Sequence, residues 1–393
     1  MQKWGKPRCT GWTIREIEAP HDVILGMGQR VSPEPFAQRA ARAADKLSDQ
    51  SRGPRFRRAV DSVGERTDAV DISVVICAFT ARRWRELGAA INSVRHQTRP
   101  AREIIVVIDH HEELLVRART AWPDVLIAPN AHARGLSGAR NTGASIARGD
   151  VVAFLDDDAQ AHERWLEHLS AAYDDSRILA AGGVVEPIWP AGRPRWFPAE
   201  FDWVVGCTHS AMPRETTAVR NLVGANMSFR SQTLVDLDGF RDGIGRIGTV
   251  PGGCEETELC IRARQRWPDR VTLYVPDARV RHTVSPERTS LRYFLSRCHA
   301  EGRSKAVVAR LVGRADGLEA ERAYVRRTLA AAIAHGLWRA VRRRASFGRP
   351  VAVLLGLGAT TAGYVSETLR GAGPFARRLR SPTTGGLAAF DDR

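Results

Sequence analysis

The stretch VVAFLDDDAQ, residues 151–160, joins a strand of buried type to three consecutive carboxylates. The apolar residues 151–155 favour a strand inside a sheet. Asp156, Asp157 and Asp158 follow directly, and adjacent carboxylates repel one another unless a cation keeps them ionised. Hard divalent ions bind such oxygens beside the phosphates of a substrate. The stretch therefore predicts a metal and phosphate site at a strand end, with a solvated strand end as the simpler alternative.

The segments before this stretch alternate between strand and helix patterns. Runs rich in β-branched residues at 72–79 and 103–109 flank a helix-like segment at 84–97. A third run at 124–129 leads through a glycine-rich turn to the helical segment 137–149. Repeated alternation of this kind predicts an α/β fold, with a mostly parallel sheet flanked by helices. Ligands of such sheets bind at the carboxyl ends of the strands, where the acidic cluster falls.

The second half of the chain is less regular. A short strand is expected at 224–230, a helix at 254–267 and a further strand at 271–282, after which the sequence becomes Arg-rich and helical. The composition divides the chain into a polar, Arg-rich and partly ordered leader (1–70), a central α/β domain (71–305) and a helical basic extension (306–393).

The overall charge restricts the partners that the chain can have. Its 393 residues carry a formal net charge of +15, and most of this excess falls after residue 300, which favours phosphate-bearing partners or an anionic membrane surface. The six cysteines form no CxxC pair and no zinc-type spacing. The N-terminus lacks the apolar core of a signal peptide, and the apolar run 350–365 is too short for a spanning helix. We expect a cytoplasmic protein that is peripheral on the inner face of the cell membrane, held there by its basic C-terminal region.

Several motifs occur in a fixed order along the central region. They are SVVICAFT (73–80), a strand ending at Asp109, GARNTG (138–143), the acidic cluster, GANMSFR (224–230), GGCEETELCIRA (252–263) and VPDARVRH (275–282). This order resembles glycosyltransferase family 2, over about residues 72–305. The resemblance implies a GT-A fold. It also implies a metal-dependent inverting enzyme that moves a sugar from a nucleoside-diphosphate sugar to a glycan, lipid-linked or small-molecule acceptor.

The resemblance also implies roles for individual residues. The residues it places around the nucleotide sugar are Ala78, Thr80, Asp109, Arg140, Asn141, Asp156, Asp157 and Asn226. Asp109 corresponds to the family's strand-end aspartate, which contacts the base or ribose. Asp158, Asp156 and His282 correspond to the ligands of a divalent metal, Mn²⁺ or Mg²⁺. A lone histidine at a strand end can also be an ordinary hydrogen-bonded side chain, so the role of His282 stays open.

The family's general base is usually the second residue of a Glu-Asp pair, and here the pair is Glu255 and Glu256. We expect Glu256 to take the proton of the acceptor hydroxyl, with Glu255 as its neighbour or as a ligand of the acceptor. Acidic residues at a helix N-terminus also complement the helix dipole, which is the role we assign to Glu258. A lipid-phosphate acceptor would ionise without help and would make Glu256 dispensable.

Other function classes fit the sequence less well. A haloacid-dehalogenase-type phosphatase would carry its acidic motif on the first strand, and a nucleotidyltransferase would place glycines in the segment CAFTARRW (77–84). A basic nucleic-acid-binding protein without catalysis fits the charge, yet no helix-turn-helix or zinc-finger pattern accompanies it. The sequence leaves the nucleotide (UDP, GDP or dTDP), the sugar, the acceptor and the oligomeric state open.

Overall fold

The computed structural model describes residues 70–248, 252–343 and 347–371, all within one unit of the chain. The leader expected over 1–70 lies outside the described residues except for Val70, and so does the end of the basic extension.

The first half of the described chain alternates strands and helices, as the sequence predicts. Its elements are β1 (Ile72–Ala78), η2 (Ala81–Arg83), α2 (Trp84–Arg95), β2 (Glu103–Ile108), α3 (Glu112–Ala121), β3 (Leu126–Pro129), α4 (Leu136–Ile146) and β4 (Val151–Asp156). β1 pairs in parallel with both β2 and β4, and β2 pairs in parallel with β3. Because all four strands point the same way, Ala78, Ile108 and Asp156 come together at one end of the sheet.

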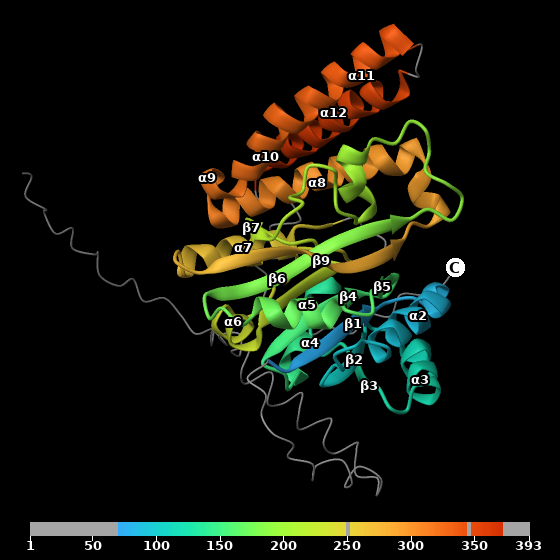
Figure 1. Ribbon diagram of the computed structural model, residues 1–393, viewed down its shortest axis with the longest axis vertical. Coiled ribbons are helices and arrows are strands. Elements are labelled where there is room, and N and C mark those ends of the chain that lie inside the picture. The colour runs from blue at the N-terminus through green and yellow to red at the C-terminus, as the bar shows by residue number, and fades with distance from the viewer. Residues whose placement is uncertain (1–69, 249–251, 344–346, 372–393) are drawn as a thin grey trace, which may run out of the picture. The chain divides into compact units, whose positions relative to one another are not determined.

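The second half adds antiparallel strands. Its elements are β5 (Ala159–Ala161), α5 (Trp165–Ala172), β6 (Ile178–Ile188), η3 (Ala199–Val205), β7 (Thr217–Ala218), β8 (Asn226–Arg230), α6 (Ser231–Asp236), α7 (Glu255–Arg266), β9 (Val271–Thr283) and η4 (Pro286–Thr289). β8 runs antiparallel between β4 and β6, whereas β9 pairs in parallel with β6. In the described part of the chain, nine strands form one sheet in the order β3-β2-β1-β4-β8-β6-β9-β5, with β7 attached to β9. The mixed α/β architecture with flanking helices is confirmed (Figure 1).

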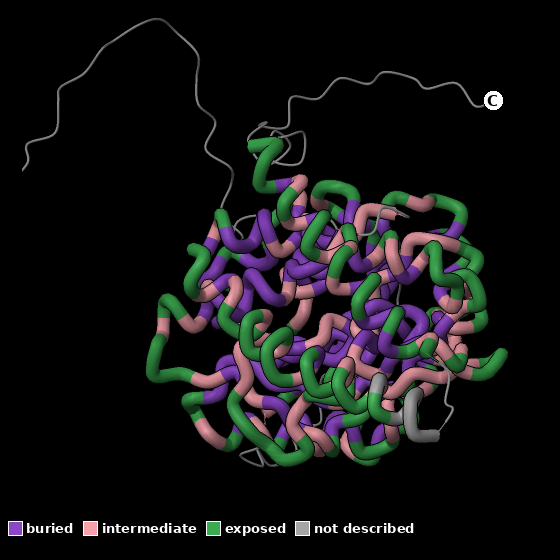
Figure 2. The backbone as a smooth tube through the Cα atoms, turned by 90° about the horizontal axis from the view of Figure 1, so that it is seen from above, coloured by how far each residue is buried: buried purple, intermediate pink, exposed green. Residues whose placement is uncertain are grey.

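The parallel strands are buried on both faces, which explains their β-branched composition. Val74 and Ile76 of β1 enter one hydrophobic cluster, and Val75 enters another. Fully burying one such side chain stabilises the fold by about 1.5–3 kcal/mol. Gly143 lets α4 approach β1 closely, because a Cβ at this position would overlap Val75. Figure 2 shows buried residues concentrated in the interior of the molecule.

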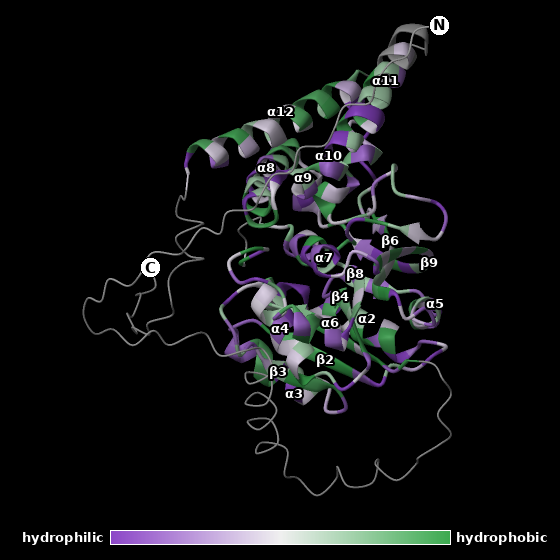
Figure 3. Ribbon diagram, turned by 90° about the vertical axis from the view of Figure 1, so that its left-hand side faces the viewer, coloured by the Kyte–Doolittle hydropathy of each residue, from purple (hydrophilic) through white to green (hydrophobic). Residues whose placement is uncertain are grey.

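The C-terminal helices lie together on one side of the sheet (Figures 1 and 3). They are α8 (Leu291–Val312), α9 (Arg314–Gly317), α10 (Glu319–Ala323), the π-helical turn η5 (Tyr324–Leu329), α11 (Ala330–Arg343) and α12 (Gly348–Leu369). α8 and α12 cross closely at Gly302 and Gly363, where a Cβ would overlap backbone of the other helix. α8 continues through residues 305 and 306, where the composition places a domain boundary. Across the ranges that the structure describes, no helix combines the length and apolar character needed to cross a membrane.

Candidate functional site

The carboxyl ends of the parallel strands open into a cavity of about 680 Å³. This volume lies within the range of pockets that hold small molecules and cofactors. The cavity is lined by Ala78, Asp109 and the acidic cluster, and also by residues of η5 and α12. The N-terminus of α7, with Glu255 and Glu256, lines the same cavity. The predicted acidic cluster and the predicted base therefore face one continuous space.

Asp156, Asp158 and His282 converge although they come from two distant parts of the chain. β5 pairs with β9 so that Ala159 lies opposite His282, which brings the histidine beside the preceding aspartate. Nε2 of His282 lies 3.0 Å from Oδ1 of Asp158. One ligand atom from each of the three residues lies within 4.8 Å of the other two.

Two arginines lie against the acidic cluster, so this trio is surrounded by closely spaced positive and negative charges. Arg83 contacts Asp157 at 2.6 Å and Asp158 at 3.1 Å, and Arg288 contacts Asp158 at 3.4 Å. Although burial acts the other way, His282 and the two arginines hold the pKa of Asp158 well below its usual range. Burial raises the pKa of Asp157 to about 7. For the imidazole of His282, burial acts to lower the pKa, but the neighbouring charge of Asp158 raises this pKa to about 10.

The trio fits a divalent cation. Two carboxylates and one imidazole are a ligand set that suits Mn²⁺. Asp157 Oδ2 is buried and has no hydrogen-bond partner among the described residues, so the cluster holds more acceptor capacity than the surrounding protein uses. A cation would satisfy this excess of oxygen atoms.

Asp109 borders the cavity and is fixed in place by hydrogen bonds. Its carboxylate accepts hydrogen bonds from Asn130 Nδ2 at 2.7 Å and from the backbone N–H of Gly135 at 3.0 Å. Gly135 is the N-cap residue of α4 and has a φ of 132°, a conformation that L side chains rarely adopt. Asp109 therefore ties the end of β2 to the start of α4.

Three of the residues expected around the donor have side chains that hold the fold together. Asn141 donates to the carbonyl of Phe240 and accepts from its N–H, at 2.7 and 2.8 Å. Asn226 donates to Ala278 O at 2.7 Å, which joins β8 to β9. The hydroxyl of Thr80 caps η2 by accepting from Arg82 N. None of these three is among the cavity-lining residues of the described chain, whereas Ala78 is.

Arg140 joins the acidic cluster to α7. It is buried, and it donates to Glu255 Oε1 at 2.7 Å, to Gly224 O at 3.0 Å and to Asp156 Oδ1 at 3.4 Å. Glu255 is thus held as the ion-pair partner of Arg140. Its second oxygen, Oε2, is buried and has no partner in the described part of the chain.

Glu256 differs from both neighbouring glutamates. It is half-buried at the first turn of α7, and the hydroxyl of Thr257 donates a long hydrogen bond to it, at 3.4 Å. Burial, followed by the negative charge of Glu255, raises the pKa of Glu256 to about 8. By contrast, Glu258 is fully buried and paired with Arg241 and Arg262. Glu256 therefore has the pKa and the accessibility that a general base needs.

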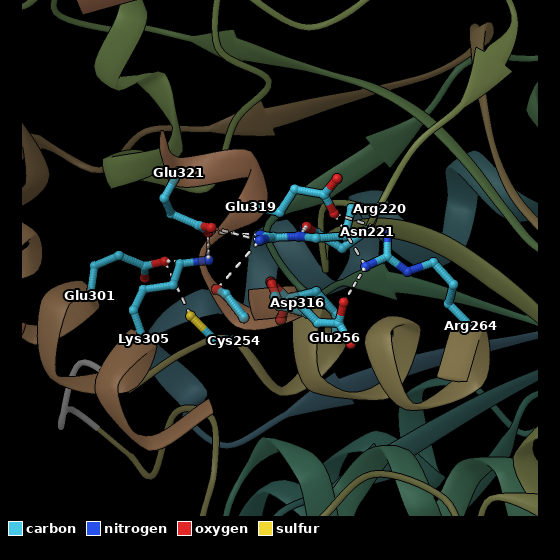
Figure 4. A network of polar contacts seen from close by, with 12 residues as sticks. Arg220, Asn221, Cys254, Glu256, Arg264, Glu301, Lys305, Asp316, Glu319 and Glu321 are labelled. Carbon is cyan, nitrogen blue, oxygen red and sulfur yellow. Dashed lines mark hydrogen bonds and ion pairs between the residues drawn. The ribbon is translucent and has the colours of Figure 1, made fainter. Parts of the chain in front are cut away.

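A polar network, which we call the α7–α8 network, connects this glutamate pair to the C-terminal helices (Figure 4). Arg220 forms two hydrogen bonds to Glu321, at 2.6 and 2.7 Å. Lys305 contacts Glu321 at 2.8 Å and Glu301 at 3.5 Å. The thiol of Cys254, the residue before Glu255, donates to Glu301 at 3.1 Å. The start of α7 is therefore fixed by groups on α8 and α10.

The sequence did not identify the arginines and the lysine of the cavity wall. They are Arg83, Arg220, Arg246, Arg288, Arg297, Lys305 and Arg327. Arg83 carries a weak signal because it follows the end of the first strand. The others lie among many arginines, and their spacing does not distinguish the cavity-facing side chains from solvated ones.

Comparison with known proteins gives consistent results. Residues 73–236 match the family model described as glycosyl transferase family 2. The chain is 34% identical over 241 residues to the glucosyl-dolichyl phosphate glucuronosyltransferase of Haloferax volcanii, which covers 60% of this chain and 77% of that one. It is 28% identical to the human probable polypeptide N-acetylgalactosaminyltransferase 8, of which it spans only 33%.

One solved structure supports the fold. It is the mannosyltransferase of Pyrobaculum calidifontis in complex with GDP-Man and Mn²⁺, which aligns with a TM-score of 0.50 at 15% identity. The alignment covers 86% of this chain and 96% of that one. At this identity the likeness concerns the arrangement of the backbone alone.

Proposed function

The chain belongs to glycosyl transferase family 2 and is a glycosyltransferase, and from this premise we propose that it transfers a sugar with inversion from a nucleoside-diphosphate sugar to an acceptor hydroxyl. The observation that carries the proposal is that the trio Asp156, Asp158 and His282 and the free carboxylate of Glu256 face one cavity. Family membership also favours this function over a phosphatase, a nucleotidyltransferase or a nucleic-acid-binding protein.

The donor occupies the end of the cavity at the parallel strands. The backbone at Ala78 and the fixed carboxylate of Asp109 border the nucleoside, and Arg140 keeps Asp156 in place beside the ribose and diphosphate. Asp156, Asp158 and His282 would hold a divalent cation, which supplies positive charge to the diphosphate when it is bound. Arg83 and Arg288 border the same place.

Glu256 acts on the acceptor. As the acceptor oxygen bonds to the anomeric carbon, its proton passes to the carboxylate of Glu256, and the bond from that carbon to the diphosphate oxygen breaks on the opposite face. Glu255 is held in an ion pair with Arg140 at 2.7 Å, so Glu256 is the member of the pair placed to take the proton. The charge of Glu255 raises the proton affinity of Glu256.

The nucleotide and the cation can be identified by thermal unfolding with UDP, GDP, dTDP or CDP in the presence of Mn²⁺, Mg²⁺ or EDTA. A ligand that binds only the folded state, at about 100 times its Kd, adds about 2.7 kcal/mol of stability. We expect one nucleoside diphosphate to stabilise the protein in a metal-dependent way. The effect should be absent in Asp158→Asn and retained in Asp174→Asn, which changes an exposed aspartate. If no nucleoside diphosphate stabilises the folded protein, the proposed donor site is wrong.

We also propose that the acceptor is lipid-linked and that α12 rests on an anionic membrane leaflet. Exposed apolar residues follow one another along α12: Val351, Leu354, Leu355, Val365 and Leu369. The one charged residue between 351 and 369, Glu367, is buried against Arg303 and Arg310. Leu357 and Thr360 of the same helix line the cavity, so a lipid beneath α12 would lie close to the acceptor end. Apolar positions along α12 are visible in Figure 3.

Vesicle sedimentation tests this contact. Leu354 and Val116 are similarly exposed, at 52% and 55%, but Val116 belongs to α3. We expect the protein to sediment with anionic vesicles at low salt, Leu354→Glu to weaken this binding and Val116→Glu to leave it unchanged. Equal binding of both variants would exclude α12 as the contact surface.

A further inference from the structure

Arg246 lies on the cavity wall and belongs neither to the metal trio nor to the glutamate pair. It belongs to the connection between α6 and α7, and its carbonyl accepts a hydrogen bond from Leu136 N at 2.9 Å. The preceding residue, Gly245, has a φ of 93°, and a Cβ there would lie 2.9 Å from Glu255 Oε2. The backbone at Arg246 is therefore held against both the start of α4 and the glutamate pair.

The guanidinium of Arg246 is surrounded by like charges. Burial, followed by the positive charges of Arg288, Arg297 and Arg83, lowers the pKa of Arg246. It forms a hydrogen bond with the hydroxyl of Tyr293 on α8. No carboxylate within the described ranges forms an ion pair with it.

The other three arginines already have acidic partners. Arg83 pairs with Asp157 at 2.6 Å, Arg288 pairs with Asp158 at 3.4 Å and Arg297 pairs with Glu301 at 2.9 Å. Among these four arginines, Arg246 is therefore the one without a carboxylate partner in the described part of the chain. A half-buried charge without a counter-ion is costly, and an anionic group of a ligand would offset that cost.

We propose that Arg246 binds the departing nucleoside diphosphate and stabilises the charge that the diphosphate gains during sugar transfer. This inference rests on the proposed function. When the bond between the anomeric carbon and the diphosphate oxygen breaks, its electron pair stays on that oxygen, and the diphosphate gains one negative charge. The proton of the acceptor passes to Glu256, so it does not neutralise this charge.

An unpaired guanidinium suits this task better than a paired one. The positive charges of Arg83, Arg288 and Arg297 are largely offset by their carboxylate partners, whereas that of Arg246 acts on the ligand without such an offset. A fixed charge that interacts more strongly with the product anion than with the intact donor lowers the barrier instead of merely tightening substrate binding.

The test separates catalysis from binding. We would measure kcat, the KM for the nucleotide sugar and inhibition by the free nucleoside diphosphate in Arg246→Gln and Arg246→Lys. Arg292→Gln is the matched control, because Arg292 is exposed on α8 and does not line the cavity. Thermal unfolding of each variant establishes that it is folded.

We expect Arg246→Gln to lower kcat by about 100-fold, the size of a lost oxyanion contact. Inhibition by the free diphosphate should weaken, while the KM for the donor stays near the wild-type value. Arg246→Lys should recover part of kcat, and Arg292→Gln should match wild type. An unchanged kcat, or a raised KM with kcat intact, would overturn the role of Arg246 while leaving the proposed function standing. A wild-type protein that binds no nucleoside diphosphate and transfers no sugar would overturn both.

Discussion

Replacing Glu255 with glutamine should move the pH profile of the enzyme to lower pH. In the native site, burial and the charge of Glu255 raise the pKa of Glu256 to about 8, and the charge of Arg140 opposes them. Arg140 is 2.7 Å from Glu255, so the negative charge of Glu255 offsets much of the positive charge that Glu256 would otherwise experience. The substitution removes a negative neighbour and at the same time releases a positive one, so both changes favour ionised Glu256.

The size of the effect follows from the titration. With a pKa of about 8, Glu256 is ionised in about a tenth of the molecules one pH unit below that value and in about a hundredth two units below it. The kcat/KM of wild type should therefore fall about tenfold per pH unit on the acid side. In Glu255→Gln we expect this limb to move down by at least about one pH unit, which corresponds to about 1.4 kcal/mol.

The assay is the initial rate of sugar transfer at low donor concentration, followed from about pH 5 to pH 9 with the cation in excess. Glu112→Gln, an exposed change in the first turn of α3, serves as the control for altered net charge. The height of the profile can fall in Glu255→Gln because Arg140 is repositioned, but the position of the limb is independent of that height. A limb that stays in place, or a wild-type limb near the ordinary glutamate pKa of 4.5, would refute the assignment of Glu256 as the base.

Three further predictions concern the base, the metal trio and the helix packing. Glu256→Gln should lower kcat by at least about 100-fold while nucleotide binding by titration stays near wild type. Because the folded-state pKa of Glu256, about 8, lies above its ordinary value of 4.5, the stability that its neutral form contributes is lost progressively as pH rises from about 4.5 to about 8. The same variant should therefore melt increasingly above wild type over this window, by a margin that stays constant at higher pH. Asp158→Ala should abolish Mn²⁺ binding measured by calorimetry, since one of three converging ligands is lost, and activity in EDTA-treated wild type should return with Mn²⁺. Gly363→Val should destabilise the protein in thermal unfolding by about 1–3 kcal/mol, because a Cβ there overlaps α8, whereas Gly358→Val meets open space and should not.

The sequence predicted the parts of the site that depend on strand order. Asp109 and the acidic cluster were assigned to the carboxyl ends of parallel strands, and the structure places them there. The convergence of His282 with Asp158 was implied by resemblance alone. Its physical cause is the pairing of β5 with β9, which no local pattern in the sequence indicates.

The direction and partners of polar side chains were not predictable in the same way. Asn141 and Asn226 stand in motifs that were expected to contact the donor, yet their amides hydrogen-bond to backbone on distant segments. The ion pair of Arg140 with Glu255 joins residues 115 positions apart. Such partnerships depend on how the finished elements pack, and spacing along the chain carries no information about them.

Deleting the C-terminal helices would not isolate the proposed membrane contact of α12, because these helices also support the cavity. A truncation after Lys305 would interrupt α8 and delete Glu321, leaving the half-buried Arg220 without its two hydrogen bonds to that residue. The same truncation would remove η5 and α12 from the cavity wall. Loss of activity in the shortened protein would therefore be expected even if α12 never touched a membrane. Point substitutions on the exposed face of α12 separate the two contributions, because Leu354 contacts solvent and lies outside the α7–α8 network.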